Sequence, residues 1–316
     1  MSEDAGIEVV VARRVTVADD VLEIELHPGE GTALPEWQAG AHIDVVTGDG
    51  LVRQYSLCGD PEDLRAYRVA VLHQPQGRGG SAWLHNELRA GDRLTIRGPR
   101  NHFPLEDASG YVFLAGGIGV TPLLPMIRQA AARAVPWALH YGGRSRTSMA
   151  YADDLQASAP AHVHLVPFDE LGLIDLEAAV AAAPPDSLVY CCGPEPLLAA
   201  AESVCSSRGL RLRTERFSPG QAASSTVDRA FTVRIASTGA ELTVPADRTI
   251  VDVLAEAGID VLTSCEEGTC GTCETVVLKG RPDHRDSVLS AEEQQAGDRM
   301  IICVSRSHTP RLVFDL

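Results

Sequence analysis

The 316-residue sequence has no apolar run that approaches the roughly 20 residues of a membrane-spanning helix. Its start, Met1-Ser-Glu-Asp, is acidic and has neither the basic and apolar regions of a secretory signal nor the arginines of a transit peptide. Positive charge is also scarce: 27 Lys and Arg against 43 Asp and Glu leave a formal net charge of −16, which repels phosphate backbones and anionic lipid surfaces. These absences predict a cytoplasmic protein that binds neither membranes nor nucleic acid.

Cysteines are likewise too few for a disulfide-dense scaffold, at eight in the whole chain. The hydrophobic share of 45% is sufficient for folded cores, and the length favours about two to three domains of roughly 150 residues each. Cys58, Cys191, Cys192 and Cys205 are scattered through the first two thirds of the chain, and the other four are near its end. Their spacing therefore matters more than their number.

Three of the last four cysteines crowd one loop, with four residues between the first pair and two between the second, and the fourth follows at a distance. This is the plant-type spacing of a 2Fe-2S cluster. Gly268 and Gly271 in the loop allow backbone amides to approach the cluster sulfurs. A structural zinc site is the alternative, but such sites favour two separated C-x2–4-C pairs. The predicted iron ligands are Cys265, Cys270, Cys273 and Cys303.

The residues around this loop predict a small domain with a helix at 250–257 that Asp247 or Thr249 can cap and that Gly258 ends. Alternating apolar residues predict strands at 231–235, 242–244, 275–278, 300–303 and 311–314. From about Val227 to Leu316 the chain resembles the plant-type ferredoxins, whose fold is a β-grasp. A Ser-, Gly-, Pro- and Ala-rich linker precedes it.

The middle of the chain alternates strands and helices, which predicts a parallel α/β sheet. A buried strand at 111–115 leads into Gly116-Gly117-Ile118-Gly119-Val120-Thr121-Pro122 and an apolar helix to about Arg133. Such a turn presents free N–H groups to a phosphate, although Gly-Gly-x-Gly departs from the G-x-G-x-x-G pattern and a plain tight turn is the alternative. Cys192-Gly193-Pro194 follows another strand at the same sheet edge, where ligands of open α/β folds bind.

The first hundred residues predict an antiparallel barrel, with strands at 8–13, 22–26, 42–46, 67–72 and 93–96. Within it, Arg53-Gln54-Tyr55-Ser56 can supply a charge, a stacking ring and a hydrogen bond to a planar cofactor. Gly77-Arg78-Gly79-Gly80-Ser81 opens a short helix at 82–88 and is a second candidate anion site.

Taken together, Arg-x-Tyr-Ser, Gly-Gly-x-Gly-x-Thr-Pro, Cys-Gly-Pro and the cysteine loop resemble the phthalate dioxygenase reductase family over nearly the whole chain. The resemblance implies an oxidoreductase that takes electrons from NADH and passes them to a terminal Rieske-type oxygenase. It also implies an FMN-binding barrel at 1–106, an NAD-binding α/β domain at 107–220, a linker at 221–229 and a 2Fe-2S domain at 230–316. Because a hydride carries two electrons and the cluster accepts one, a flavin must stand between them.

The same resemblance implies the cofactor contacts. Flavin-binding residues would be Arg53, Tyr55, Ser56, Leu72, Gly79, Gly80, Ser81 and Phe217. Nicotinamide dinucleotide would meet Gly116, Gly117, Gly119, Thr121, Pro122, Arg144, Cys192, Gly193 and Pro194. Ser56 and Cys192 would be nearest the reacting atoms, as positioning groups.

Three alternatives remain open at this stage. Arg144 and Arg146 follow the second strand of the α/β region and favour NADPH, whereas the family mostly implies NADH. FMN is implied over FAD by the C-terminal place of the cluster. The electron acceptor could instead be a haem monooxygenase, or the chain could be a non-enzymatic iron-sulfur shuttle or redox sensor.

Overall fold

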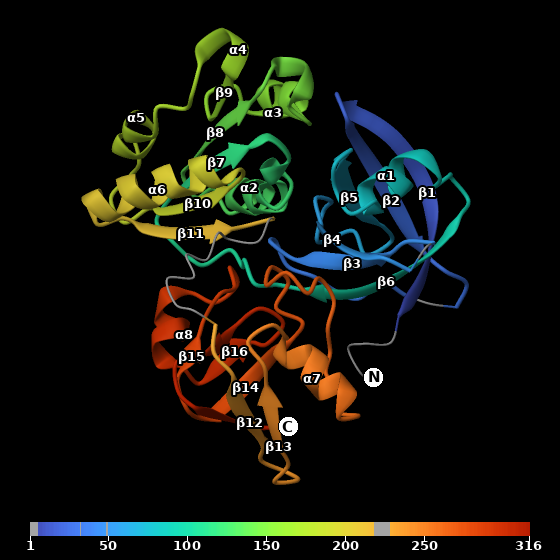
Figure 1. Cartoon of the computed structure of the whole chain (residues 1–316). Helices are drawn as coiled ribbons and strands as arrows, with labels where there is room; N and C mark the ends of the chain where they lie inside the picture. The colour runs from blue at the N-terminus through green and yellow to red at the C-terminus, as the bar shows by residue number, and fades with distance from the viewer. Residues whose placement is uncertain (1–5, 32, 49, 218–227) are drawn as a thin grey trace. The chain divides into compact units, whose positions relative to one another are not determined.

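The computed structural model describes residues 6–31, 33–48, 50–217 and 228–316 (Figure 1). The chain forms two compact units, Met1–Glu215 and Arg216–Leu316. Most of the predicted linker, residues 221–227, lies outside the described residues. In the described part of the chain, no helix is both long and apolar enough to cross a membrane.

The first unit begins with an antiparallel sheet in the order β4-β3-β6-β1-β2-β5. Its elements are β1 (Ile7–Ala18), β2 (Val21–Pro28), β3 (His42–Val46), β4 (Val52–Ser56), β5 (Tyr67–Leu72), α1 (Gly80–Asn86) and β6 (Arg93–Arg100). A bridge between Leu57 and Val69 joins the two edge strands, so the sheet curls into the predicted barrel. β1 runs past its predicted end because its pairing with β2 continues through two irregularities in register.

A five-stranded parallel sheet follows, in the order β11-β10-β7-β8-β9. Its strands are β7 (Tyr111–Gly116), β8 (Trp137–Gly143), β9 (Val163–Pro167), β10 (Leu188–Cys192) and β11 (Arg211–Glu215). The intervening helices are η1 (Gly117–Val120), α2 (Leu123–Ala132), η2 (Arg146–Ser148), α3 (Ala152–Ser158), α4 (Phe168–Leu171), α5 (Leu176–Ala181) and α6 (Glu195–Arg208). Because β8 and β9 lie on one side of β7 and β10 and β11 on the other, the strand order reverses at β7, where such folds bind ligands.

The side chains of β7 alternate between two hydrophobic cores. Val112 and Leu114 pack with residues of α5 and α6. Phe113 packs in a second core that contains residues of α2 and also Val21 and Ala70 from the barrel. The barrel and the parallel sheet therefore share buried apolar surface, and this common core holds them in one compact unit.

The second unit contains a mixed sheet in the order β13-β12-β18-β14-β16. Its elements are β12 (Phe231–Ile235), β13 (Glu241–Val244), α7 (Ile250–Glu256), β14 (Glu274–Lys279), β15 (Pro282–Asp283), α8 (Ala291–Ala296), β16 (Arg299–Ile301), β17 (Arg306–Ser307) and β18 (Arg311–Phe314). Thr249 caps α7: its hydroxyl accepts from the Asp252 amide at 3.1 Å, and the Asp252 carboxylate accepts from the Thr249 amide. The strand predicted at 300–303 ends at Ile301, so Cys303 lies in the turn after it.

Candidate functional site

The glycine turn after β7 lies against the end of β10. A Cβ on Gly119 would stand 2.2 Å from the Cys192 carbonyl oxygen, and one on Gly116 would stand 2.5 Å from Pro194 Cδ. Only glycine permits this approach, which brings the two predicted dinucleotide segments together. The Thr121 hydroxyl donates to the Ile118 carbonyl at 2.9 Å and so closes the turn itself.

Three polar side chains meet at the carboxyl edge of the parallel sheet. Cys192 is fully buried and pairs in register with Glu215 at the end of β11, and its Sγ lies 4.0 Å from Glu215 Oε2. The Glu215 carboxyl also makes a hydrogen bond with the side chain of Ser56 from the barrel. The structure therefore brings both predicted positioning residues, Ser56 and Cys192, to one carboxyl group.

Burial sets the protonation of this group. It raises the pKa of Glu215 to about 8, against the lowering effect of the Ser56 hydrogen bond. Burial, together with the Glu215 charge, also raises the pKa of the Cys192 thiol well above its ordinary value. A protonated thiol is a poor nucleophile, which agrees with a positioning role. Glu215 was not among the predicted site residues, and the signal for it is its place at the end of the last strand of the sheet.

On the barrel side, Arg53 of β4 packs over the start of α1. Its Nη2 donates to the Arg78 carbonyl at 2.9 Å, and a Cβ on Gly80 would stand 2.5 Å from Arg53 Cγ. Gly79 has φ +88°, in the left-handed region that favours glycine. The Ser81 hydroxyl accepts from the Gln74 amide at 3.1 Å. Arg53 and the turn at residues 79–81 are thus neighbours, as a shared anion site requires.

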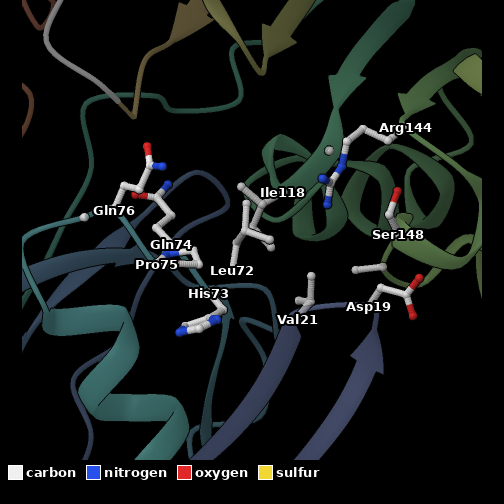
Figure 2. Close-up of a pocket in the computed structure, with 13 residues that line it drawn as sticks. Asp19, Val21, Leu72, His73, Gln74, Pro75, Gln76, Ile118, Arg144 and Ser148 are labelled. Carbon is white, nitrogen blue, oxygen red and sulfur yellow. The ribbon is translucent and has the colours of Figure 1, made fainter.

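A cavity of about 550 Å³ opens between the barrel and the parallel sheet (Figure 2). Leu72, Gly117 and Arg144, all predicted cofactor residues, line it. Gly77 and Ile118, from the two predicted glycine segments, also line it, and the lining residues that were not predicted are Asp19, Val21, His73, Gln74, Pro75, Gln76, Ser148 and Ala150. Figure 2 shows Arg144 reaching toward the cavity from the parallel sheet, opposite the glutamines of the β5–α1 loop. Phe217 belongs to the second unit and is 43% exposed, and its contact with the flavin stays a prediction.

The four predicted iron ligands are buried together in the second unit. The side chain of Cys265 contacts those of Cys270 and Cys303, and Cys273 contacts Cys303. The Glu267 amide donates to Cys265 Sγ at 3.3 Å. Four converging sulfurs with an amide donor fit a 2Fe-2S cluster, in which each iron takes two thiolates.

The loop geometry explains its glycines. Gly268 and Gly271 both have φ +72°. A Cβ on Gly268 would also stand 2.6 Å from Val304 Cγ2, so a larger residue there would push the loop away from the segment after Cys303. The remaining cysteines, Cys58, Cys191 and Cys205, are buried in unit 1, as expected of small apolar residues.

Comparison with known proteins agrees with this geometry. Residues 233–308 match the 2Fe-2S iron-sulfur cluster binding domain, and residues 113–203 match the oxidoreductase NAD-binding domain. The first match supports the cluster over the zinc alternative.

The chain is 43% identical over 302 residues to the phenoxybenzoate dioxygenase subunit beta of Ectopseudomonas oleovorans, covering 95% of this chain and 94% of that protein. It resembles the solved phthalate dioxygenase reductase with a TM-score of 0.72 and 33% identity over 99% of both chains. It also resembles an intact type IV self-sufficient cytochrome P450 monooxygenase, with a TM-score of 0.92 and 42% identity, and spans 41% of that longer chain.

The family's cofactors are NADH, FMN and a 2Fe-2S cluster, as predicted. Two matched domains, full-length relatives and a solved structure agree on one arrangement of modules. This oxidoreductase chain belongs to the phthalate dioxygenase reductase family.

Proposed function

We propose that this chain is the reductase component of an oxygenase system and delivers electrons from NADH to a terminal Rieske-type oxygenase. The observation that carries the proposal is the meeting of Ser56, Cys192 and Glu215 at the carboxyl edge of the parallel sheet, in a unit whose cavity is lined by both sheets. The four-cysteine loop of the second unit supplies the one-electron carrier. Relatives named as dioxygenase components support the choice of partner.

The residues of this chain would bind the flavin and the dinucleotide and orient them. Bound FMN would supply the chemistry that converts the two-electron hydride of NADH into single electrons for the cluster. Gly117 has open space around it and would leave room for the dinucleotide, Gly119 lets the turn pack against Cys192, and Arg53 with the turn at 79–81 would hold the flavin phosphate. The Glu215 carboxyl, protonated below about pH 8, adds no negative charge beside Ser56 and Cys192.

An acceptor test examines the proposal directly. The purified holoprotein is reduced anaerobically with NADH, and its flavin and cluster absorbance are followed before either a Rieske oxygenase or a P450 is added. We expect NADH to bleach both chromophores. The reductase should then pass its electrons to the added Rieske protein, which substrate and oxygen reoxidise. Bleaching with transfer only to the P450 would favour the second candidate, which the likeness to the self-sufficient P450 supports. A protein that NADH does not reduce would be a shuttle or sensor instead.

We further propose that NADH is preferred over NADPH. Arg146 is engaged by α3: its Nη2 donates to Asp153 at 2.7 Å and to Gln156 at 2.9 Å. It is therefore not available to pair with a 2′-phosphate. Asp169, whose amide donates to the Arg144 carbonyl at 3.1 Å, places an acid at the carboxyl end of β9. Negative charge so near Arg144 in the fold opposes the binding of a 2′-phosphate and so favours NADH.

Removing the partner of Arg146 is expected to change this preference. The Asp153→Ala variant should raise kcat/KM for NADPH about threefold, the order of one exposed ion pair, and leave that for NADH unchanged. Asp154→Ala is the matched control, because this exposed neighbour makes no contact with Arg146 among the described residues. Equal NADPH kinetics in both variants would contradict the assignment.

Two finer points are also proposed. We place the boundary between the flavin-binding and dinucleotide-binding halves of the first unit at residue 106, and that of the cluster domain at 230. We place the protein in the cytoplasm, a reducing compartment where the eight cysteines stay free of disulfides.

A further inference from the structure

Hydrogen bonds cross between the barrel and the parallel sheet along one wall of the cavity. The Asp19 amide, in the β1–β2 turn, donates to the Thr147 carbonyl at 2.9 Å, and the Thr147 hydroxyl donates to the Asp19 carboxylate at 2.5 Å. Asp19 and Ser148 line the cavity on this side (Figure 2). The segment from Thr147 to Tyr151 is therefore both a cavity wall and the link between the two sheets.

Tyr151 makes the buried part of this link. Its hydroxyl donates to Glu23 Oε2 on β2 at 2.9 Å and lies 3.7 Å from Cys58 Sγ. Glu23 is only 8% exposed, and its other oxygen accepts from Arg13 at 2.8 Å. Burial raises the pKa of Tyr151, so the phenol keeps its proton and remains a donor. The contact is thus a charge-assisted hydrogen bond shielded from water, the stronger kind.

The backbone at Tyr151 supports a special role. Its φ is +60° and ψ is +9°, the left-handed region, at the residue before α3. A bulky residue adopts this conformation only where its surroundings hold it, and such residues gather at functional sites. Here the ring packs against the core shared by the two sheets, and the hydroxyl reaches the barrel.

We propose that Tyr151 is a positioning residue for hydride transfer, which holds the dinucleotide-binding sheet at a fixed distance from the flavin-binding barrel. The inference rests on the proposed function. Ser56 comes from the barrel and Cys192 from the sheet, so their separation depends on how the two are held together. A displacement of about 1 Å between reacting atoms can cost roughly a hundredfold in rate.

The Tyr151→Phe variant removes one oxygen atom and tests the proposal in the holoprotein. We expect kcat for NADH-dependent ferricyanide reduction to fall at least about tenfold, with a smaller change in KM. The isotope effect with C4-deuterated NADH should rise, because hydride transfer becomes more rate-limiting. A residue that only stabilised the fold would lower flavin content without raising the isotope effect per flavin.

Tyr67→Phe is the matched control. The Tyr67 hydroxyl donates to the Pro35 carbonyl inside the barrel, so its loss also removes one buried phenol hydrogen bond but does not affect the contact between the sheets. We expect wild-type kcat and isotope effect for this variant. The double variant Tyr151→Phe with Glu23→Ala should be no slower than the slower single variant, since both changes break the same contact.

Three results would contradict the role of Tyr151 or the proposed function. Wild-type kcat and isotope effect in flavin-loaded Tyr151→Phe would overturn the inference. If Tyr151→Phe loses its flavin, Thr147→Val replaces it, because this variant removes one hydroxyl contact with Asp19. It should show a smaller fall in kcat and a smaller rise in the isotope effect. Wild-type values for Thr147→Val would also overturn the inference. A wild-type protein that does not oxidise NADH would contradict the proposed function instead.

Discussion

Replacing Cys303 with serine is expected to abolish NADH-dependent cytochrome c reduction while leaving ferricyanide reduction largely intact. Cys303 Sγ contacts both Cys265 and Cys273, so the variant loses the thiolate on which the other ligands converge. The cluster should fail to assemble, with loss of iron and of the visible absorbance of the centre. Ferricyanide is expected to take electrons from the flavin, which the separate compact unit Met1–Glu215 would bind.

Cys205→Ser provides the matched control for this variant. Cys205 is as buried as Cys303 but lies on α6 in an apolar core far from the cysteine loop in sequence. We expect it to retain iron and both activities. Loss of both activities in a folded, flavin-loaded Cys303→Ser protein would contradict a relay in which the flavin precedes the cluster.

The parts of the site that could be predicted are those encoded locally. Three cluster ligands lie within nine residues, Cys265 to Cys273, and the left-handed Gly268 and Gly271 sit where the loop must turn tightly. Short-range patterns of this kind need no knowledge of the tertiary fold. The glycine turn after β7 was a weaker signal because it departs from the G-x-G-x-x-G pattern, and the reason for Gly119, its contact with Cys192 far along the chain, is visible only in the structure.

Glu215 and Tyr151 could not be assigned from the sequence because their partners are distant along the chain. Glu215 meets Cys192 only through the parallel register of β10 and β11, and meets Ser56 only because the barrel shares a core with the sheet. The end of the strand at Ile301 has a related cause: the chain must turn for Cys303 to reach the cysteine loop. Pairing across elements decides each of these features.

The Glu215→Gln variant is expected to remove the pH dependence of NADH oxidation above neutrality. With a pKa of about 8, the Glu215 carboxyl is neutral at pH 7 and ionised at pH 9. A hydride that arrives beside Ser56 and Cys192 brings negative charge, which an ionised carboxylate in the same buried site opposes. The wild-type rate, followed by stopped-flow bleaching of the flavin, should therefore fall about tenfold between pH 7 and pH 9. Glutamine keeps an oxygen and donors for Ser56, and its rate should stay flat.

The raised pKa of Glu215 also makes the free energy of unfolding depend on pH. Between the ordinary value of 4.5 and about 8, the folded protein keeps a proton on Glu215 that the unfolded chain has released, so the free energy of unfolding decreases as pH rises through this range and levels off above it. Glu215→Gln should lose this component of the melting temperature's pH dependence, whereas Glu30→Gln, at an exposed turn, should keep it. Identical pH profiles for the two variants would show that Glu215 is not the acid whose pKa is raised in this site. If Glu215→Gln instead flattens the pH profiles of both the rate and the melting temperature, both dependences belong to the Glu215 carboxyl group. This group is then held neutral so that negative charge can enter the site.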